Sequence, residues 1–329
     1  MKQELKNIIT VGASAGGIEA VSVFLNALPA DVDVAVFVVI HLPAQAIMDV
    51  VVRQLRRNAK FPCSVPSDGE EIKKQHVYIA PADKHMMLQK DKILVRRGAK
   101  ENHWRPAIDV LFRSAAAAYG SCVIGVILTG LLDDGTSGMV AIKKCGGICI
   151  VQHPQEALYA DMPLNVINTI DVDYSVSVLE MGYIIEDVLL RRDCQPSLIP
   201  EDVRQEAEVT MRMNSDYREV KVLGEQTALT CPDCGGVLTE LEDENTPRYR
   251  CFTGHAFTAE QLDISQKEAL ENSIWVAVRM LEERRNLLVS LSKKKSNYPR
   301  ISLDQEQRAE EIKTHIQRLK EFLSNIGRM

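Results

Sequence analysis

The chain has 329 residues, a formal net charge of −6 at pH 7 and a hydrophobic content of 46%. This length allows more than one domain with a sizeable core, and the composition is ordinary for a globular protein. The acidic balance gives no indication of nucleic-acid binding. Because no run of about 18 apolar residues is present, we expect no membrane insertion.

Residues 1–7 contain neither the apolar core nor the cleavage site of a signal peptide. We therefore expect a cytoplasmic protein. In such a reducing compartment, the eight cysteines are expected to be thiols or metal ligands rather than disulfides.

An apolar, β-branched run at 8–11 leads into a segment of small residues, Gly12-Ala13-Ser14-Ala15-Gly16-Gly17, and a helical pattern follows. Gly12 to Gly16 matches G-x-S-x-G between a strand and a helix, which is the context of a nucleophile elbow. Small residues beside the serine allow the sharp turn, and the N–H groups that open the helix point toward whatever the hydroxyl attacks. Ser14 is therefore a candidate nucleophile.

The same segment allows two other interpretations. A dinucleotide-binding loop requires G-x-G-x-x-G and an acid about 20 residues further on. Here position 14 is serine, and the next strand ends in His41. The elbow is favoured, and a plain strand-to-helix turn stays open until partners for Ser14 are found.

Apolar strands alternate with helices through the first 192 residues. Helices are expected at 16–28, 44–57, 106–119, 138–144 and 177–192, and strands at 8–11, 35–40, 122–128 and 148–151. Continuous apolar strands are typical of parallel sheets that are buried on both faces. The alternation predicts a doubly wound, mostly parallel α/β sheet. Residues 60–98 are less regular, and we expect a β insertion there beside the main sheet.

Polar residues follow two of the other buried strands at their carboxyl ends, where open α/β sheets place their sites. His41 follows the second strand, and Asp133 and Asp134 follow the third. The structural alternatives are a loop-capping histidine and a helix N-cap formed by either aspartate. If these residues meet Ser14, the imidazole accepts the serine proton and a carboxylate orients the imidazole. The pattern predicts an acyl-transfer enzyme with an oxyanion site formed by backbone N–H groups near Ala15.

Over residues 5–192 the chain resembles the catalytic domain of the chemotaxis protein-glutamate methylesterases. The motifs that carry the resemblance lie, in order, at 11–17, 40–44, 78–81, 105–112, 128–135 and 162–163. Members of that family hydrolyse glutamyl methyl esters on chemoreceptors and deamidate receptor glutamines. The resemblance implies Ser14 as nucleophile, His41 as base and Asp134 rather than Asp133 as acid.

The same resemblance implies that Ala15, Leu131 and Arg105 lie at the oxyanion and substrate positions. Ala15 stands where the family usually has threonine, and Leu131-Leu132 replaces the usual Met-Gly. A backbone oxyanion donor survives both changes. Because the matching stretch begins near the first residue, we expect a stand-alone form without a phosphoacceptor receiver domain.

The resemblance also implies catalysis without a cofactor and a methylated receptor or signalling protein as partner. Two alternatives stay open. In the first, the chain is a non-catalytic signalling adaptor that uses the esterase fold and its C-terminal modules to bind partners. In the second, it is a nucleotide-binding fold.

Four potential metal ligands follow in the second half of the chain, Cys231, Cys234, Cys251 and His255. Their spacing is C-x2-C, sixteen residues, then C-x3-H, which is typical of a closed tetrahedral zinc site. We expect structural rather than catalytic zinc, with unligated thiols as the alternative.

Beyond residue 259 apolar residues recur at three- and four-residue steps in two stretches, which predicts a helical hairpin or coiled coil. These helices either support self-association or pack on the enzyme domain. The expected division is a catalytic domain at 1–194, a linker at 195–224 with a helix near 201–213, a zinc-ribbon-like module at 225–260 and the helices at 261–329. Metal removal is expected to loosen only the C-terminal module.

Overall fold

A computed structural model describes residues 7–192, 194, 198–212, 220–241, 247–294 and 299–326. The chain forms two compact units, residues 1–259 and 260–329, which are described separately. Among the described residues, no helix combines the length and the apolarity that a bilayer span requires.

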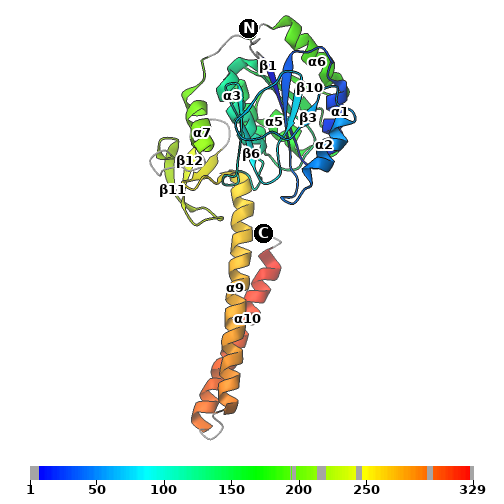
Figure 1. Cartoon of the computed structure of the whole chain (residues 1–329). Coiled ribbons are helices and arrows are strands. Elements are labelled where there is room, and N and C mark those ends of the chain that lie inside the picture. Colours follow the sequence, from blue (N-terminus) through cyan, green and yellow to red (C-terminus); the bar gives the residue numbers. More distant parts are fainter. Residues whose placement is uncertain are drawn as a thin grey trace. The chain divides into compact units, whose positions relative to one another are not determined.

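Seven strands form the main sheet of the first unit (Figure 1). In spatial order they are β10 (Tyr174–Val176), β9 (Ile148–Gln152), β8 (Val123–Ile127), β1 (Asn7–Ala13), β2 (Val34–Ile40), β5 (His76–Ile79) and β3 (Cys63–Ser64). Every neighbouring pair is parallel. The chain moves from β1 to β2 on one side, and β8 lies on the other side of β1. The strand order therefore reverses at β1, which is where open α/β sheets bind ligands.

Helices cover both faces of this sheet, which confirms the predicted doubly wound fold. One face carries α1 (Gly17–Ala27), α2 (Met48–Arg56) and α6 (Val178–Arg191), and the other carries α3 (Ile108–Tyr119), α4 (Thr136–Lys144) and α5 (Asp161–Thr169). Figure 1 shows α1 and α2 on one side of the strands and α3 on the other. Strands β1, β2 and β8 are buried almost completely because both of their faces are covered.

The irregular region 60–98 divides between two sheets. Strands β4 (Glu70–Glu71), β6 (His85–Gln89) and β7 (Lys92–Arg96) form a separate antiparallel sheet, as expected for an insertion. Strand β5 instead joins the main sheet as the parallel neighbour of β2. Its residues Val77, Tyr78 and Ile79 are all buried, as expected for a strand that lies between β2 and β3 and is covered on both faces.

Residues 198–259 add a helix and a second antiparallel sheet to the first unit. Helix α7 (Glu201–Arg212) packs against α3. The ribbon, defined here as residues 224–258, contains β11 (Gly224–Thr230), β12 (Val237–Leu241), β13 (Arg248–Cys251) and β14 (Ala256–Thr258) in that spatial order. The division into domains at 194, 224 and 260 stays a prediction, although the helix expected near 201–213 is present.

The second unit consists of α9 (Ala259–Lys294) and α10 (Pro299–Ile326). The two helices contact each other through an ion pair between Lys320 and Glu282 at 2.8 Å. The Ser302 hydroxyl also donates to the Ser292 carbonyl at 3.2 Å. These contacts agree with the expected helical hairpin.

One expectation about the cysteines is wrong. Cys122 and Cys194 form a disulfide across 72 residues of sequence. Cys122 immediately precedes β8, at the end of the short helix η1 (Gly120–Cys122), and Cys194 follows α6. Helices in a parallel α/β fold run back toward the amino ends of the strands, so the end of α6 reaches the beginning of β8. The other six cysteines are free thiols.

Candidate active site

Ser14 occupies the sharp turn between β1 and α1. Its N–H donates to the Thr129 carbonyl at 3.0 Å, and its carbonyl accepts from the Gly17 N–H at 2.9 Å. Gly16 has a φ of +74°, a conformation that favours glycine. A Cβ on Gly130 would lie 2.8 Å from the Ser14 Cβ, so the chain after β8 passes directly beside the serine.

The structure brings Ser14, His41 and Asp134 together at the carboxyl edge of the sheet. The Ser14 Oγ lies 3.2 Å from the His41 Nδ1, and the His41 Nε2 lies 2.8 Å from the Asp134 Oδ2. A carboxylate only accepts hydrogen bonds, so Nε2 carries the ring proton and Nδ1 is left to accept the serine proton. His41 and Asp134 are buried, whereas Ser14 is half-buried and accessible.

Asp134 is held at the start of α3. Its Oδ2 accepts the Ile108 N–H at 2.7 Å, and its Oδ1 accepts from the Asn102 side chain at 3.1 Å and the Asp109 N–H at 3.3 Å. The Asp133 carboxylate instead accepts a hydrogen bond from the Thr258 hydroxyl at 2.5 Å. The geometry therefore favours Asp134 over Asp133 as the partner of His41.

Sequence reasoning missed three neighbours of this arrangement. The Trp104 ring stacks on the His41 ring with a centroid distance of 4.1 Å and an interplanar angle of 8°. Asn102 donates to both Asp134 and Asp109. Asp109 lies inside the 105–112 motif, yet nothing in its local spacing shows that it faces another carboxylate.

Asp109 is buried beside Asp134. Burial, and then the Asp134 charge, raise the pKa of Asp109 from 3.8 to about 8. The folded protein therefore keeps a proton up to about pH 8 that the unfolded chain releases near pH 4.

This pKa difference predicts a pH dependence of stability. The contribution from Asp109 is complete below about pH 4 and is lost as the pH rises toward 8, because the unfolded chain binds fewer protons across that window. We expect Asp109→Asn, which does not titrate, to reduce the fall in the free energy of unfolding between pH 4 and pH 8. Urea denaturation at a series of pH values measures this, and equal slopes for variant and wild type would contradict it.

The expected oxyanion and substrate residues differ in their surroundings. Within the described part of the chain, no acceptor faces the backbone N–H of Ala15 or of Leu131. Ala15 follows Ser14 in sequence, and Leu131 follows Gly130, which lies directly beside the Ser14 side chain. Arg105 instead binds Asp83 at 2.9 Å and the Gly98 carbonyl at 2.6 Å, and this contact lowers the pKa of Asp83. A substrate role for Arg105 stays a prediction.

The expected metal ligands also come together. The ligand atoms of Cys231, Cys234, Cys251 and His255 all lie within 4.8 Å of one another. The Cys234 and Cys251 sulfurs are 3.7 Å apart, and the His255 Nδ1 lies 3.5 Å from the Cys251 sulfur and 3.7 Å from the Cys231 sulfur. Tetrahedral zinc with bonds of about 2.0–2.3 Å separates its ligand atoms by about 3.5–3.8 Å. The donor set and its dimensions fit zinc.

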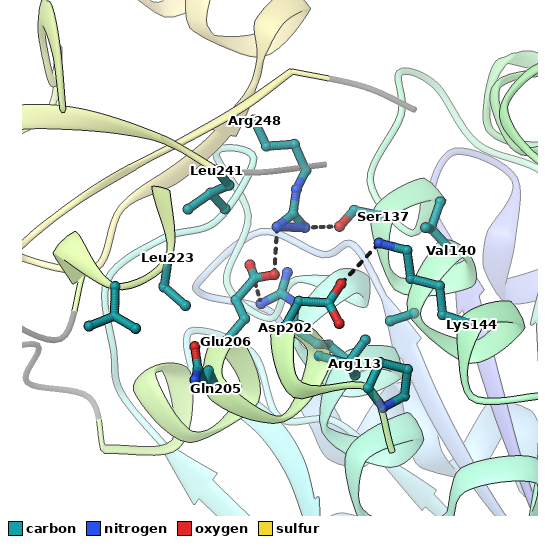
Figure 2. A pocket seen from close by; sticks show the side chains of 14 residues that line it. Arg113, Ser137, Val140, Lys144, Asp202, Gln205, Glu206, Leu223, Leu241 and Arg248 are labelled. Atoms are coloured by element: carbon teal, nitrogen blue, oxygen red, sulfur yellow. Dashed lines mark hydrogen bonds and ion pairs between the residues drawn. The ribbon is translucent and has the colours of Figure 1, made fainter. Parts of the chain in front are cut away.

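A cavity of about 700 Å³ lies apart from both sites, between α4, α7 and the ribbon (Figure 2). Its charged side chains pair with one another. Arg248 binds Glu206 at 2.6 Å and also donates to Ser137, and Lys144 binds Asp202 at 3.0 Å. No residue of the Ser14 site lines this cavity. Its lining instead connects the ribbon residue Arg248 to helices α4 and α7.

A serine bonded to a histidine and a carboxylate, on the turn after a parallel strand, is the arrangement of a serine hydrolase. The CheB methylesterase family matches residues 9–185. The chain belongs to the CheB methylesterase family.

Individual relatives agree with this assignment. A Leptospira interrogans protein is 38% identical over 171 residues, which cover 52% of this chain and 88% of that protein. Protein-glutamate methylesterase/protein-glutamine glutaminase 2 of Rhizobium johnstonii is 34% identical over 194 residues, which cover 58% of this chain and 52% of the relative. The crystal structure of the Thermotoga maritima CheB methylesterase catalytic domain superposes with a TM-score of 0.53 at 30% identity, over 55% of this chain and 98% of that one.

Proposed function

We propose that this protein is a serine esterase that hydrolyses glutamyl methyl esters on a receptor or another signalling protein, and that it also deamidates glutamines there. The single observation that carries the proposal is the hydrogen-bonded series from Ser14 through His41 to Asp134. The names of the relatives, which combine methylesterase and glutaminase activities, support this substrate class.

The geometry supports a two-step acyl transfer. The Ser14 Oγ attacks the ester carbonyl while the His41 Nδ1 accepts the serine proton, and Asp134 stabilises the imidazolium. His41 then returns that proton to the departing methoxide, and methanol leaves an acyl-enzyme on Ser14. Water, deprotonated by His41, attacks the acyl-enzyme, and His41 returns that proton to the Ser14 Oγ as the Oγ–acyl bond breaks and the glutamate side chain leaves. From a glutamine amide, ammonia leaves instead of methanol.

The developing oxyanion needs donors that are not already used within the fold. The backbone N–H groups of Ala15 and Leu131 meet this condition among the described residues. We assign both as oxyanion donors, each worth roughly 3–4 kcal/mol in the transition state. Neither donor depends on the identity of its side chain, so the replacements at these two positions leave the chemistry intact.

Methanol release from a methylated receptor fragment tests the proposed activity, and fluorophosphonate labelling tests the nucleophile. Release together with labelling of Ser14 supports the esterase. Failure of both reactions would favour the non-catalytic signalling adaptor. Self-association through α9 and α10 stays a prediction.

We further propose that Cys231, Cys234, Cys251 and His255 hold a structural zinc ion. Asp233 supports this assignment, because its Oδ2 lies 3.7 Å from the His255 Nε2, the ring nitrogen other than the Nδ1 that meets the sulfurs. Zinc would cross-link the two turns of the ribbon. The Ser14 chemistry itself needs no cofactor.

Protein purified without chelator is expected to contain about one zinc ion per chain, because a closed Cys3His site binds zinc tightly. Cys251→Ser should lose the metal. Cys63→Ser, which alters a free thiol outside the cluster, should retain it. Elemental analysis by mass spectrometry measures both, and equal zinc contents in the two variants would refute the assignment.

A further inference from the structure

The short turn at residues 101–104, called here the 101–104 turn, lies between the ribbon and the Ser14 site. Its first and last residues are bridged, with the Trp104 N–H donating to the Glu101 carbonyl at 2.9 Å. Trp104 stacks on the His41 ring. The turn therefore contacts the proposed catalytic base directly.

Asn102 connects the ribbon to the proposed catalytic acid. Its Nδ2 donates to Asp134 at 3.1 Å and to Asp109 at 2.9 Å. Its Oδ1 accepts the Thr258 N–H at 3.3 Å, and its own N–H donates to the Ala256 carbonyl at 2.9 Å. Two carboxyl oxygens on one side and an N–H on the other determine which way this buried amide points.

The ribbon strand β14 also reaches the adjacent aspartate. The Thr258 hydroxyl donates to the Asp133 carboxylate at 2.5 Å. His103 makes an edge contact with Phe257 at a ring distance of 6.1 Å. Strand β14 thus touches Asp133 directly and Asp134 through Asn102.

Charged residues attach the preceding ribbon strand to the same turn. Arg250 is 1% exposed and binds Glu101 at 2.6 Å, and Arg113 of α3 binds Glu101 at 3.2 Å. Burial would raise the pKa of Glu101, but the charges of Arg250 and Arg113 hold it well below its ordinary value. A buried, ionised Glu101 requires these partners, so the position of β13 is coupled to that of the turn.

The residues of this attachment adjoin the proposed zinc ligands in sequence. Arg250 precedes Cys251, and Ala256 follows His255. Between the two ligands the chain makes a tight turn, in which the Cys251 N–H donates to the His255 carbonyl at 2.9 Å and the Gly254 N–H donates to the Cys251 carbonyl at 3.0 Å. A metal ion held by Cys251 and His255 would set the direction in which β14 leaves this turn.

We propose that the ribbon is a metal-dependent positioning element of the esterase site, and that Asn102 and Thr258 are positioning residues for Asp134. Zinc holds the turn between β13 and β14, β14 holds the 101–104 turn, and that turn holds Asp134 and the His41 ring. This inference rests on the proposed function, and it adds a route by which metal or thiol chemistry at the ribbon alters the esterase rate.

Thr258→Val tests the positioning role in the zinc-loaded full chain. The substitution removes the hydroxyl bound to Asp133 and keeps the side-chain shape. We expect kcat for methanol release to fall by about tenfold to 100-fold, the range that a small misplacement costs, with KM unchanged because no substrate contact is removed. Thr227→Val is the matched control, since its hydroxyl bonds only within the ribbon, and both constants should stay within about twofold of wild type.

Hydrogen exchange measured by mass spectrometry tests the metal dependence without using activity. On zinc chelation, peptides covering 99–105 and 130–137 should exchange faster, while β1 and β2 stay protected. This result would differ from the expectation, drawn from the sequence alone, that metal removal loosens only the C-terminal module. Acceleration confined to 224–258 would overturn the proposal. If chelation unfolds the whole chain, the zinc-loaded Thr258→Val variant provides the test. Unchanged hydrogen exchange at 130–137 together with an unchanged kcat in that variant would overturn the proposal.

The failure of the proposed function can be told apart from the failure of this inference. Zinc-loaded wild type that neither labels with a fluorophosphonate nor releases methanol rejects the esterase. The exchange rates of 130–137 in Thr258→Val and Thr227→Val still decide whether β14 holds the Asp134 loop. In the opposite outcome, wild-type protein labels with the fluorophosphonate at the same rate with and without zinc and shows the same hydrogen exchange at 99–105 and 130–137 in both states. That result supports the esterase and rejects the metal-dependent positioning element.

Discussion

Ser14→Ala is expected to lower the rate of methanol release from a methylated receptor fragment by about 10⁴-fold or more. Ser14 supplies the oxygen that becomes the acyl-enzyme bond, and its Oγ lies 3.2 Å from the His41 Nδ1 that accepts its proton. Alanine removes the attacking atom while leaving the Ala15 and Leu131 N–H groups in place. The residual rate would then report what the oxyanion donors and substrate binding contribute without a nucleophile.

A matched serine variant separates loss of the nucleophile from loss of the fold. Ser22 lies on α1, its hydroxyl accepts a hydrogen bond from Asn58 at 2.7 Å, and it takes part in no proposed chemical step. Ser22→Ala should keep kcat within about twofold of wild type and should still label with a fluorophosphonate. Methanol release by Ser14→Ala at the wild-type rate would reject the proposed mechanism.

Asp134→Asn is expected to lower kcat by about 10⁴-fold, because an amide no longer fixes the His41 tautomer or stabilises the imidazolium. In wild type the Asp134 Oδ2 accepts from His41 at 2.8 Å and from the Ile108 N–H at 2.7 Å. An asparagine amide nitrogen in either oxygen position would face a donor. His41 would then tend to carry its proton on Nδ1, where it blocks acceptance of the Ser14 proton.

The neighbouring aspartate provides the comparison. Asp133→Asn changes the same charge one residue away, but Asp133 contacts Thr258 rather than His41. We expect its loss of kcat to be at least about 100-fold smaller than that of Asp134→Asn, which leaves room for a positioning effect. Steady-state methanol release, measured with the two variants at equal protein concentration, gives the difference. Equal losses in the two variants would mean that Asp134 has no special role.

Much of the fold was predictable because its signals are local. The strands at 35–40 and 148–151 are continuous apolar runs, and both lie in the buried parallel sheet. The helix at 177–192 begins with a capping box in which Ser177 and Glu180 exchange hydrogen bonds, a pattern confined to four residues. The metal-ligand spacing is equally local within each pair, which is why Cys231 with Cys234 and Cys251 with His255 could be matched.

The predictions that failed or were never made concern pairings through space. Cys122 and Cys194 looked like ordinary thiols because 72 residues separate them, and only the return of α6 to the amino edge of the sheet brings them together. Strands β11 and β14 were not foreseen, since β11 is largely exposed and β14 has three residues. Their pairing with β12 and β13 depends on neighbours rather than on their own pattern.

The amino-acid sequence by itself determined the elbow at Ser14, the parallel α/β sheet and the two halves of the metal cluster. Each of these follows from the residues of a turn, from the period of the apolar residues or from a spacing over a few residues. Only the tertiary structure decided that Asn102 lies between Asp134 and Thr258, and that Glu101 meets Arg250. Thr258 and Arg250 lie about 150 residues from Asn102 and Glu101 in sequence, and their contact follows from the way the ribbon folds back onto the 101–104 turn. No local pattern encodes such a contact, because burial and pairing of polar side chains are properties of the packed molecule.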